Sequence, residues 1–309
     1  MKILLTGAFG YKGTVLLPKL RQAGHKVITL DTGWFGGKPD IKIDLRQIKH
    51  VPEVDAVIHL ANIANDPCGE LDAKLTWEVN GLGTVLLAEA CIRSGVKRFI
   101  FASSASVYGI KGNEPVVETT PLEPISDYNK TKMVAERILM SYADRMNVQI
   151  VRPATVCGMS PRMRLDVIVN MLTMQALTKG EITAHCGAHG ASLMRPHTHM
   201  EDVTDLYVWL LDRPAVTGVY NAGFENLSVL DLCKKIQKYA SAKVTVTEVQ
   251  DKRSYCVDSS KLLNAGFKPR WSVDDAIYEI CLAYRNGSLR DGLINHNLPW
   301  MKAHGWVAG

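Results

Sequence analysis

Two residues four positions apart, Tyr128 and Lys132, could move a proton together. Residues 128–132 read YNKTK, so the two side chains share one face if this segment is helical. A free tyrosine has a pKa of about 10, and lowering it to about 7 takes roughly 4 kcal/mol of preferential phenolate stabilisation. A lysine ammonium about 4 Å away supplies roughly that amount at an effective dielectric constant of about 20. The pair is therefore typical of a tyrosine that acts as a base toward a hydroxyl, with Ser104 as the donor that holds the substrate oxygen beside Tyr128.

A glycine-rich loop near the start of the chain has the spacing of a dinucleotide site. Residues 6–13 read TGAFGYKG, after a strand-like run at 3–5 and before a helix expected over 15–23. In such a loop Gly7 permits a tight turn, Gly10 lets the backbone approach a pyrophosphate, and Gly13 lets the helix pack close to the strand. The helix N-terminus attracts phosphate. Together, the loop and the Tyr-Lys pair predict hydride transfer to a nicotinamide cofactor with an accompanying proton transfer.

Asp31 selects between the two nicotinamide cofactors. It ends a strand expected over 27–30, 18 residues after Gly13, where a carboxylate can accept hydrogen bonds from both adenosine ribose hydroxyls. Because it would repel a 2′-phosphate, we expect NAD. Lys12 either touches phosphate or extends to solvent. Further cofactor contacts are expected from the loop and from strand ends: Phe9, Tyr11, Asp44, Leu45, Leu60, Ala61, Ala102, Ser103 and Pro153, besides Tyr128 and Lys132.

The elements that must position these residues follow an α/β pattern. Short apolar runs expected as strands (3–5, 27–30, 54–60, 99–102, 148–151) alternate with segments of helical periodicity (15–23, 75–93, 127–146). This alternation predicts a Rossmann fold, a doubly wound parallel sheet with right-handed crossovers. Beyond it the pattern loosens, with helices expected near 165–178, 202–212, 229–240 and 272–286 and strands near 181–184, 218–222 and 243–248.

We therefore divide the chain into an NAD-binding domain of residues 1–155 and a smaller C-terminal α/β lobe of residues 156–309 that binds substrate over the strand ends. Some segments of the second half are expected to return to the first sheet. The tail from Leu289 to Gly309 carries Trp300 and Trp306 but no interpretable pattern.

Composition excludes several classes of protein. The 309 residues are 47% hydrophobic and 22% charged, as in globular proteins, and no apolar run approaches the roughly 18 residues that span a bilayer. The net charge of +5 is spread without a basic cluster, so we expect no nucleic-acid partner and at most a mild preference for anionic small molecules. Seven widely spaced cysteines favour a reducing, cytoplasmic location over a disulfide framework.

Five potential metal ligands fall within residues 185–199. They are His185, Cys186, His189, His197 and His199. Zinc spacings can look like this, but the stretch is glycine-rich, and we expect ordinary loop and core residues with no metal.

Several segments of the chain carry a family resemblance: residues 6–13, 103–109, 121–132, 152–153 and 195–203. They resemble the extended short-chain dehydrogenase/reductase family, in its NAD-dependent nucleotide-sugar epimerase/dehydratase branch, over nearly the whole chain. The resemblance implies bound NAD and a nucleoside-diphosphate-sugar substrate. It also implies a homodimer in which helices 75–93 and 127–146 form a four-helix bundle across a twofold axis.

The same resemblance implies particular site residues. The catalytic triad would be Ser104, Tyr128 and Lys132. The substrate would be contacted by Ser104, Ser106, Thr155, Asn170, Arg195 and Arg253, of which the last three match positions that hold the phosphates. Guanidinium groups suit a diphosphate, because they form two parallel hydrogen bonds to its oxygens.

The residues after Ser104 narrow the reaction. Family 4,6-dehydratases carry threonine, aspartate and glutamate where this chain has Ser104, Ala105 and Ser106, so that mechanism of dehydration is not expected. The segment is similar to that of sugar 4-epimerases. However, Thr155 replaces the usual asparagine, and residues 160–166 resemble members that only oxidise or reduce a sugar such as a GDP-heptose. Three hypotheses follow: a 4-epimerase, a nucleotide-sugar dehydrogenase or reductase, and a non-catalytic cofactor-sensing protein.

Overall fold

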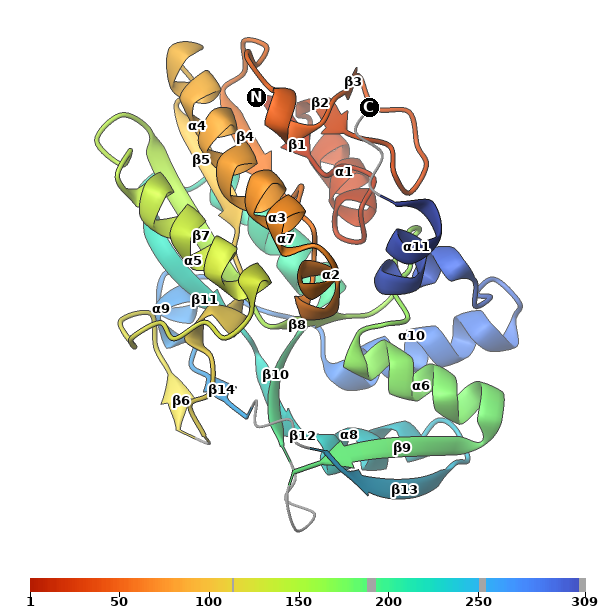
Figure 1. The fold of residues 1–309 in the computed structure, drawn as a ribbon. Helices are drawn as coiled ribbons and strands as arrows, with labels where there is room; N and C mark the ends of the chain where they lie inside the picture. Colours follow the sequence, from red (N-terminus) through yellow and green to blue (C-terminus); the bar gives the residue numbers. More distant parts are fainter. Residues whose placement is uncertain (113, 188–192, 250–253, 306–309) are drawn as a thin grey trace.

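A seven-stranded parallel sheet forms the centre of the computed structural model, which describes residues 1–112, 114–187, 193–249 and 254–305 (Figure 1). The strand order is β11-β7-β5-β4-β1-β2-β3. The strands are β1 (Lys2–Thr6), β2 (Lys26–Asp31), β3 (Ile41–Lys42), β4 (Ala56–His59), β5 (Arg98–Ala102), β7 (Asn147–Pro153) and β11 (Gly218–Ala222). The expected Rossmann architecture is confirmed, and β11 shows that a segment of the second half extends the sheet.

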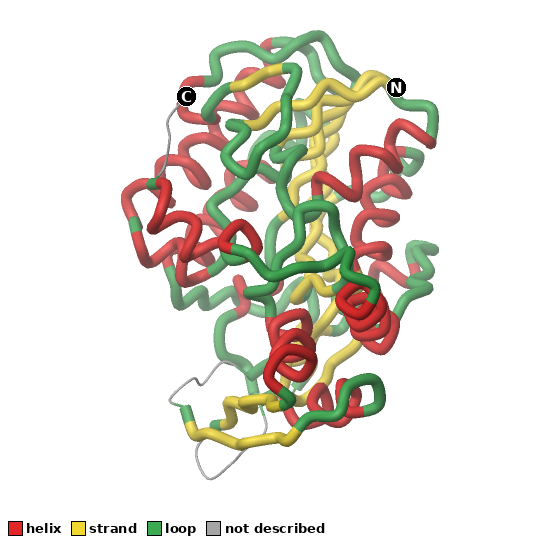
Figure 2. The backbone as a smooth tube through the Cα atoms, turned by 90° about the vertical axis from the view of Figure 1, so that its right-hand side faces the viewer, coloured by secondary structure: helices red, strands yellow, loops and turns green. Residues whose placement is uncertain are grey.

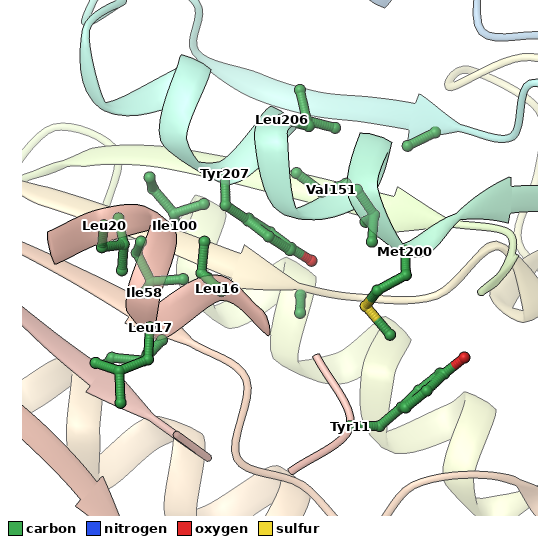
Figure 3. Close-up of a cluster of buried hydrophobic side chains, with 14 of the residues drawn as sticks. Tyr11, Leu16, Leu17, Leu20, Ile58, Ile100, Val151, Met200, Leu206 and Tyr207 are labelled. Carbon is green, nitrogen blue, oxygen red and sulfur yellow. The ribbon is translucent and has the colours of Figure 1, made fainter. Parts of the chain in front are cut away.

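Helices cover both faces of this sheet, as Figure 2 shows from the side. On one face, α1 (Gly13–Gln22) and α7 (Met200–Leu211) pack over the strands, and Figure 3 shows Leu16, Leu20 and Tyr207 gathered in one cluster with Ile58 and Ile100. On the other face lie α4 (Gly83–Arg93) and α5 (Asp127–Met140). Apolar strands covered on both sides need no polar face, which explains their continuous hydrophobic runs.

The chain differs from expectation at the helix predicted over 75–93. The structure has α2 (Asp66–Leu71), α3 (Ala73–Thr76), a π-helical segment at Trp77–Leu82, and then α4. The widened turn aims Asn80 at the loop after β4, where its amide accepts from Ile63 N at 2.9 Å and donates to Ile63 O at 3.1 Å. The periodicity of the apolar residues did not separate this segment from the α-helices beside it, because a single widened turn is too short to set a period of its own. Likewise α5 ends at Met140 and not near residue 146, because residues 141–145 form turns.

The second half builds a smaller α/β lobe below the sheet in Figure 1. Its helices are α6 (Ile168–Lys179), α8 (Val229–Gln237) and α10 (Val273–Arg285), close to the expected positions, with α9 (Ser260–Asn264) nearer the large sheet. Its strands β9 (Glu181–Cys186) and β13 (Lys243–Glu248) pair in parallel, with Glu181 opposite Lys243. Short strands that were not anticipated link the lobes: β8 (Thr155–Cys157), β10 (Met194–His199), β12 (Glu225–Ser228), β6 (Pro115–Val116) and β14 (Cys256–Val257).

The tail also contains a helix, α11 (Asn297–His304), which lies between α2 and the lower lobe (Figure 1). Among the described residues, no helix has the length and apolar character to cross a bilayer.

Candidate active site

The glycine loop closes tightly against the neighbouring strand ends. Gly7 has a φ of +68°, and a Cβ there would lie 2.6 Å from the backbone nitrogen of Ala61. A Cβ at Gly13 would lie 2.2 Å from the carbonyl oxygen of Gly7. Neither position has room for a side chain, so the loop can bring the start of α1 directly to the edge of the sheet, where its N-terminal N–H groups can bind a phosphate.

Asp31 is fixed by the loop that it faces. Its carboxylate accepts hydrogen bonds from the backbone nitrogens of Phe9 at 3.0 Å and Gly33 at 2.9 Å. Burial raises the pKa of Asp31, and these backbone donors oppose the rise. Each carboxylate oxygen keeps further lone pairs, so the group can still accept hydrogen bonds from a ribose diol.

A cavity of about 550 Å³ runs from this loop across the carboxyl ends of the strands. Most of the expected cofactor residues line it: Gly7, Gly10, Tyr11, Gly13, Asp31, Asp44, Leu45, Leu60, Ala61, Ser103, Tyr128 and Pro153. Three of the expected cofactor residues do not line the cavity. Phe9 packs against Gly37, while Ala102 and Lys132 bond to each other beneath the floor.

Tyr128 and Ser104 lie together at the carboxyl end of β5. Ser104 caps a short 3₁₀ turn by accepting from Ser106 N at 3.2 Å, and its Oγ lies 2.7 Å from Ser106 Oγ. Tyr128 stands at the start of α5, whose first turn is capped by Ser126. Lys132 follows one turn later, with its Nζ 5.9 Å from the centre of the Tyr128 ring.

The protein by itself does not lower the pKa of Tyr128. Burial, followed by the charge of Asp66, raises this pKa to about 12, although a hydrogen bond with Ser104 and the charge of Arg164 act in the opposite direction. The sequence-based estimate counted charges that favour the phenolate, and the structure adds burial and the charge of Asp66, which oppose them. The sequence spacing gave the shared helix face but neither the burial nor Asp66.

The expected substrate contacts fall into three groups. Ser104, Ser106, Thr155 and Arg195 line the cavity. Asn170 is fully buried behind it, where its amide accepts from Gly158 N and donates to Tyr11 Oη at 2.9 Å and to Arg164 O at 2.8 Å. Arg253 lies outside the described residues.

The histidines considered as metal ligands have other surroundings. His185 bonds to Thr247 Oγ1 at 2.7 Å, His197 is buried in β10, and His199 caps α7 while stacking on Trp271. His189 lies outside the described residues. Within the part of the chain that the structure describes, no three histidine, cysteine or acidic side chains are grouped as a metal site would require.

Comparison with known proteins decides the family, because the model described as "NAD dependent epimerase/dehydratase family" matches residues 3–223. The chain belongs to the NAD-dependent epimerase/dehydratase family. The resemblance inferred from the motifs is thereby confirmed, and so is NAD as the cofactor.

Relatives within the family include sugar-nucleotide epimerases. The chain is similar to a UDP-glucose 4-epimerase of Lactobacillus helveticus, with 28% identity over 317 residues that cover 90% of this chain and 95% of the relative. Among solved structures it is similar to a UDP-glucuronic acid 4-epimerase from Bacillus cereus in complex with UDP-glucuronic acid and NAD. That match has a TM-score of 0.80 and 26% identity, and covers 93% of this chain and 99% of the other. The NDP-hexosamine 5,6-dehydratase TunA shares the fold, with a TM-score of 0.82 at 24% identity over 94% and 98% of the two chains.

The residues present fit the family's cofactor. The glycine loop leaves space only for backbone, Asp31 faces the cavity, and the cavity leads from both to Tyr128. Family membership does not explain a further set of charged side chains on the same cavity wall. Lys12, Arg162, Arg164 and Asp166 line the cavity from the glycine loop and from the β8–α6 loop, and Asn297 joins them from α11. No sequence motif marked Asn297, because its place depends on how the tail folds back.

Proposed function

We propose that this enzyme is an NAD-dependent nucleotide-sugar 4-epimerase. The observation that carries the proposal is the placement of Ser104 and Tyr128 on one cavity with the glycine loop, with Ala105 and Ser106 where family dehydratases have acidic residues. Ala105 is fully buried, and the Ser106 hydroxyl donates to Asn129 Oδ1, so neither can supply the acid and base of water elimination.

The chain's own residues would move the proton. Ser104 donates a hydrogen bond to the sugar oxygen at C4 and holds it beside Tyr128. Tyr128, as phenolate, takes the proton of the 4-hydroxyl. It later returns the proton to the oxygen at C4 of the sugar with inverted configuration. Lys132 positions the site from below. NAD, when bound, would supply the acceptor for the hydride that leaves C4 and the donor that returns it. The ketone formed in this way must turn over within the cavity before it is reduced again.

We propose a UDP-hexose as the first substrate to test, because the similar proteins include UDP-sugar epimerases. Arg195 faces the cavity and, with Arg253, would pair with the diphosphate, while Ser106 and Thr155 would contact the sugar. Asn170 would act from behind the wall, through the loop that it ties to Tyr11. In this assignment residues 1–155 form the cofactor domain, and the later residues form the substrate lobe apart from segments such as β11 that return to the central sheet.

The deciding experiment is turnover of UDP-glucose, UDP-galactose and UDP-glucuronate by purified protein without added NAD. We expect interconversion of 4-epimers with no build-up of NADH, and a loss of about 100-fold or more in Tyr128→Phe, which should keep its NAD. Stoichiometric NADH would instead support a dehydrogenase or reductase. Activity on no nucleotide sugar, together with redox-dependent binding of a partner protein, would support the cofactor-sensing hypothesis.

We also propose a homodimer formed through α4 and α5. The exposed hydrophobic side chains on and beside these helices support it: Trp77, Leu82 and Met140 are 37%, 51% and 38% exposed. Light scattering after gel filtration tests it, with Leu82→Glu expected to shift the mass toward the monomer.

A cytoplasmic location is proposed as well. All seven cysteines are described, and all are free and buried, which suits a reducing compartment. Cell fractionation would test it directly.

A further inference from the structure

Arg162 is a buried cation without a matching anion. It lies in the loop between β8 and α6, is 7% exposed and lines the cavity. Its guanidinium carbon sits 3.5 Å from the centre of the Phe35 ring, and Nη2 donates to Asn297 Oδ1 at 2.5 Å. Its Nε has no hydrogen-bond partner, and within the described residues it forms no ion pair. An arginine held this firmly yet left unpaired is arranged to bind something that the chain does not supply.

Lys12 is a second such cation on the same cavity. It occupies the N-cap position of α1, directly after Tyr11, and the structure gives its ammonium no hydrogen bond or ion pair among the described residues. A positive charge at a helix N-terminus is repelled by the helix dipole, so this position is unfavourable unless an anion lies between them. Burial, followed by the charge of Arg164, lowers the pKa of Lys12 to about 8.

The charges on this wall do not cancel. Arg164 pairs with Asp166, from Nε to Oδ1 at 2.8 Å, and Asp166 is the carboxylate beside the two arginines. Three cations, Lys12, Arg162 and Arg164, therefore face one carboxylate, which leaves two positive charges. A pyrophosphate diester carries two negative charges, one on each phosphate, so the wall and such a ligand are complementary.

We propose that Arg162 and Lys12 bind the pyrophosphate of NAD from the side opposite the glycine-loop backbone, and that Asn297 of α11 holds Arg162 in place. The positions of Lys12 and Arg162 on the cavity favour the pyrophosphate of NAD over the diphosphate of the substrate. Lys12 belongs to the glycine loop itself, and Phe35, on which Arg162 stacks, follows Asp31 in the loop that faces the adenosine ribose. In NAD the pyrophosphate links the adenosine ribose to the nicotinamide ribose, so it would lie between Asp31 and Tyr128. The substrate's diphosphate is instead expected at Arg195.

The C-terminal segment holds the charged loop between β8 and α6 in place. Asn297 N donates to Asp166 Oδ2 at 3.0 Å, so one residue holds both sides of the charged loop. Trp300 lies beside Phe35, at 6.1 Å between ring centres, and Trp34 Nε1 donates to Gly305 O at 3.1 Å. Figure 1 shows α11 beside α2, between the two lobes. The tail thus ties the loop after β2 to the loop after β8 across the proposed pyrophosphate site, which would slow the departure of NAD.

The proposal is tested by cofactor binding, without reference to the sugar reaction. The variants are Arg162→Gln, Arg162→Lys, Asn297→Ala and Lys12→Met, with Arg213→Gln as the matched control, because Arg213 also stacks on an aromatic ring, Trp209, at 4.4 Å. NAD retained per protomer after gel filtration is measured first. Calorimetric titrations of cofactor-depleted protein then compare NAD, ADP-ribose and adenosine, and thermal unfolding checks that each variant folds.

We expect Arg162→Gln to lower the affinity for NAD and ADP-ribose by about 10-fold to 100-fold, and the affinity for adenosine hardly at all. The affinity of Arg162→Lys for NAD should lie between those of Arg162→Gln and the parent, because lysine keeps the charge but cannot form two parallel hydrogen bonds to a phosphate. Asn297→Ala should release NAD faster, Lys12→Met should weaken it, and the salt dependence of NAD binding should be shallower in Arg162→Gln. Arg213→Gln should match the parent.

Two results would overturn the proposal. One is parental retention of NAD by a folded Arg162→Gln variant. The other is unchanged affinity for NAD and ADP-ribose with a raised KM for the sugar nucleotide, which would assign the cation to the substrate's anion. Either result would leave the proposed sugar reaction untouched, and a failure to epimerise any sugar would leave the binding measurements equally valid.

Discussion

Lys132 donates a hydrogen bond from Nζ to the carbonyl oxygen of Ala102 at 2.7 Å. The bond joins α5 to the end of β5, in a place where the lysine is only 3% exposed. Burial, followed by the charge of Lys12, lowers the pKa of Lys132 well below its ordinary value, while Glu136 opposes the fall. A buried cation held by a carbonyl costs folding free energy, so its presence points to a role in the site above it.

Replacing this lysine should therefore separate activity from stability. In Lys132→Met we expect turnover to fall by about 100-fold or more, because the site loses both the charge and the group that positions it. The free energy of unfolding should not fall, because relief of several kcal/mol of desolvation offsets the roughly 1–3 kcal/mol for an unpaired Ala102 carbonyl. Turnover assays and urea denaturation measure the two effects. A variant that keeps parental turnover would contradict this role.

The pKa of Tyr128 should depend on the redox state of the cofactor. In the protein alone, burial raises it to about 12, so the neutral phenol is the stable form at neutral pH. A positively charged nicotinamide ring nearby favours the phenolate, and each unit of downward shift represents about 1.4 kcal/mol of that preference. We expect the titration midpoint to be lower with NAD⁺ than with NADH, and turnover to rise with pH through the midpoint.

Ultraviolet difference titration of the parent against Tyr128→Phe isolates this one phenol. Asp66→Asn supplies an independent check, because the charge of Asp66 raises the pKa of Tyr128 and its removal should lower the midpoint. Identical midpoints with both forms of the cofactor would show that the ring charge does not reach Tyr128.

The parts of this site that follow from the sequence are those fixed by local rules. The roles of Gly7 and Gly13 could be predicted because only glycine fits where an added Cβ would lie 2.2–2.6 Å from neighbouring backbone atoms. The central strands could be predicted because both of their faces are buried, which makes their sequences continuous apolar runs. The proximity of Tyr128 and Lys132 could be predicted because a helix places residues four positions apart on one face.

The remaining parts depend on segments that meet only after folding. Arg162 and Asn297 are 135 residues apart, and nothing in the pattern near either residue indicates the bond between them. The short strands β8 and β10 form because each completes a pairing with the other, not because of their own composition. The pKa of Tyr128 depends on such segments for a related reason, because its burial is a property of the assembled site.

Gly69 provides a steric test of the position of Tyr128. It lies in α2, where an added Cβ would sit 3.0 Å from the Cβ of Tyr128 and 3.3 Å from its backbone nitrogen. Gly69→Ala should push the start of α5 by a few tenths of an ångström, so we expect turnover to fall about 10-fold with NAD retention unchanged. Gly81→Ala is the matched control, because its Cβ would make only an ordinary contact, 3.6 Å from the Trp77 ring. Equal turnover in the two variants would show that the site tolerates this displacement.

His197 should make the fold sensitive to acid. It is fully buried in β10, neither ring nitrogen has a hydrogen-bond partner among the described residues, and burial, followed by the charge of Arg195, lowers its pKa to about 3. In the unfolded chain the pKa is about 6.5, so between these values the unfolded state binds a proton that the folded state does not. Stability is therefore full above about pH 6.5 and falls as the pH is lowered, by at most about 1.4 kcal/mol per unit for this residue.

His197→Leu should remove that part of the slope and raise stability at pH 5 more than at pH 7, as measured by urea denaturation at both values. His59→Leu is the matched control. The pKa of His59 is also lowered to about 3 by burial and then by Lys132, but its ring bonds to Thr6 at 2.7 Å and Thr84 at 3.0 Å. Loss of the His59 ring should flatten the slope equally while lowering stability at pH 7, because two buried hydroxyls each lose one hydrogen bond. If neither substitution changes the slope, the acid sensitivity of the fold arises from other groups.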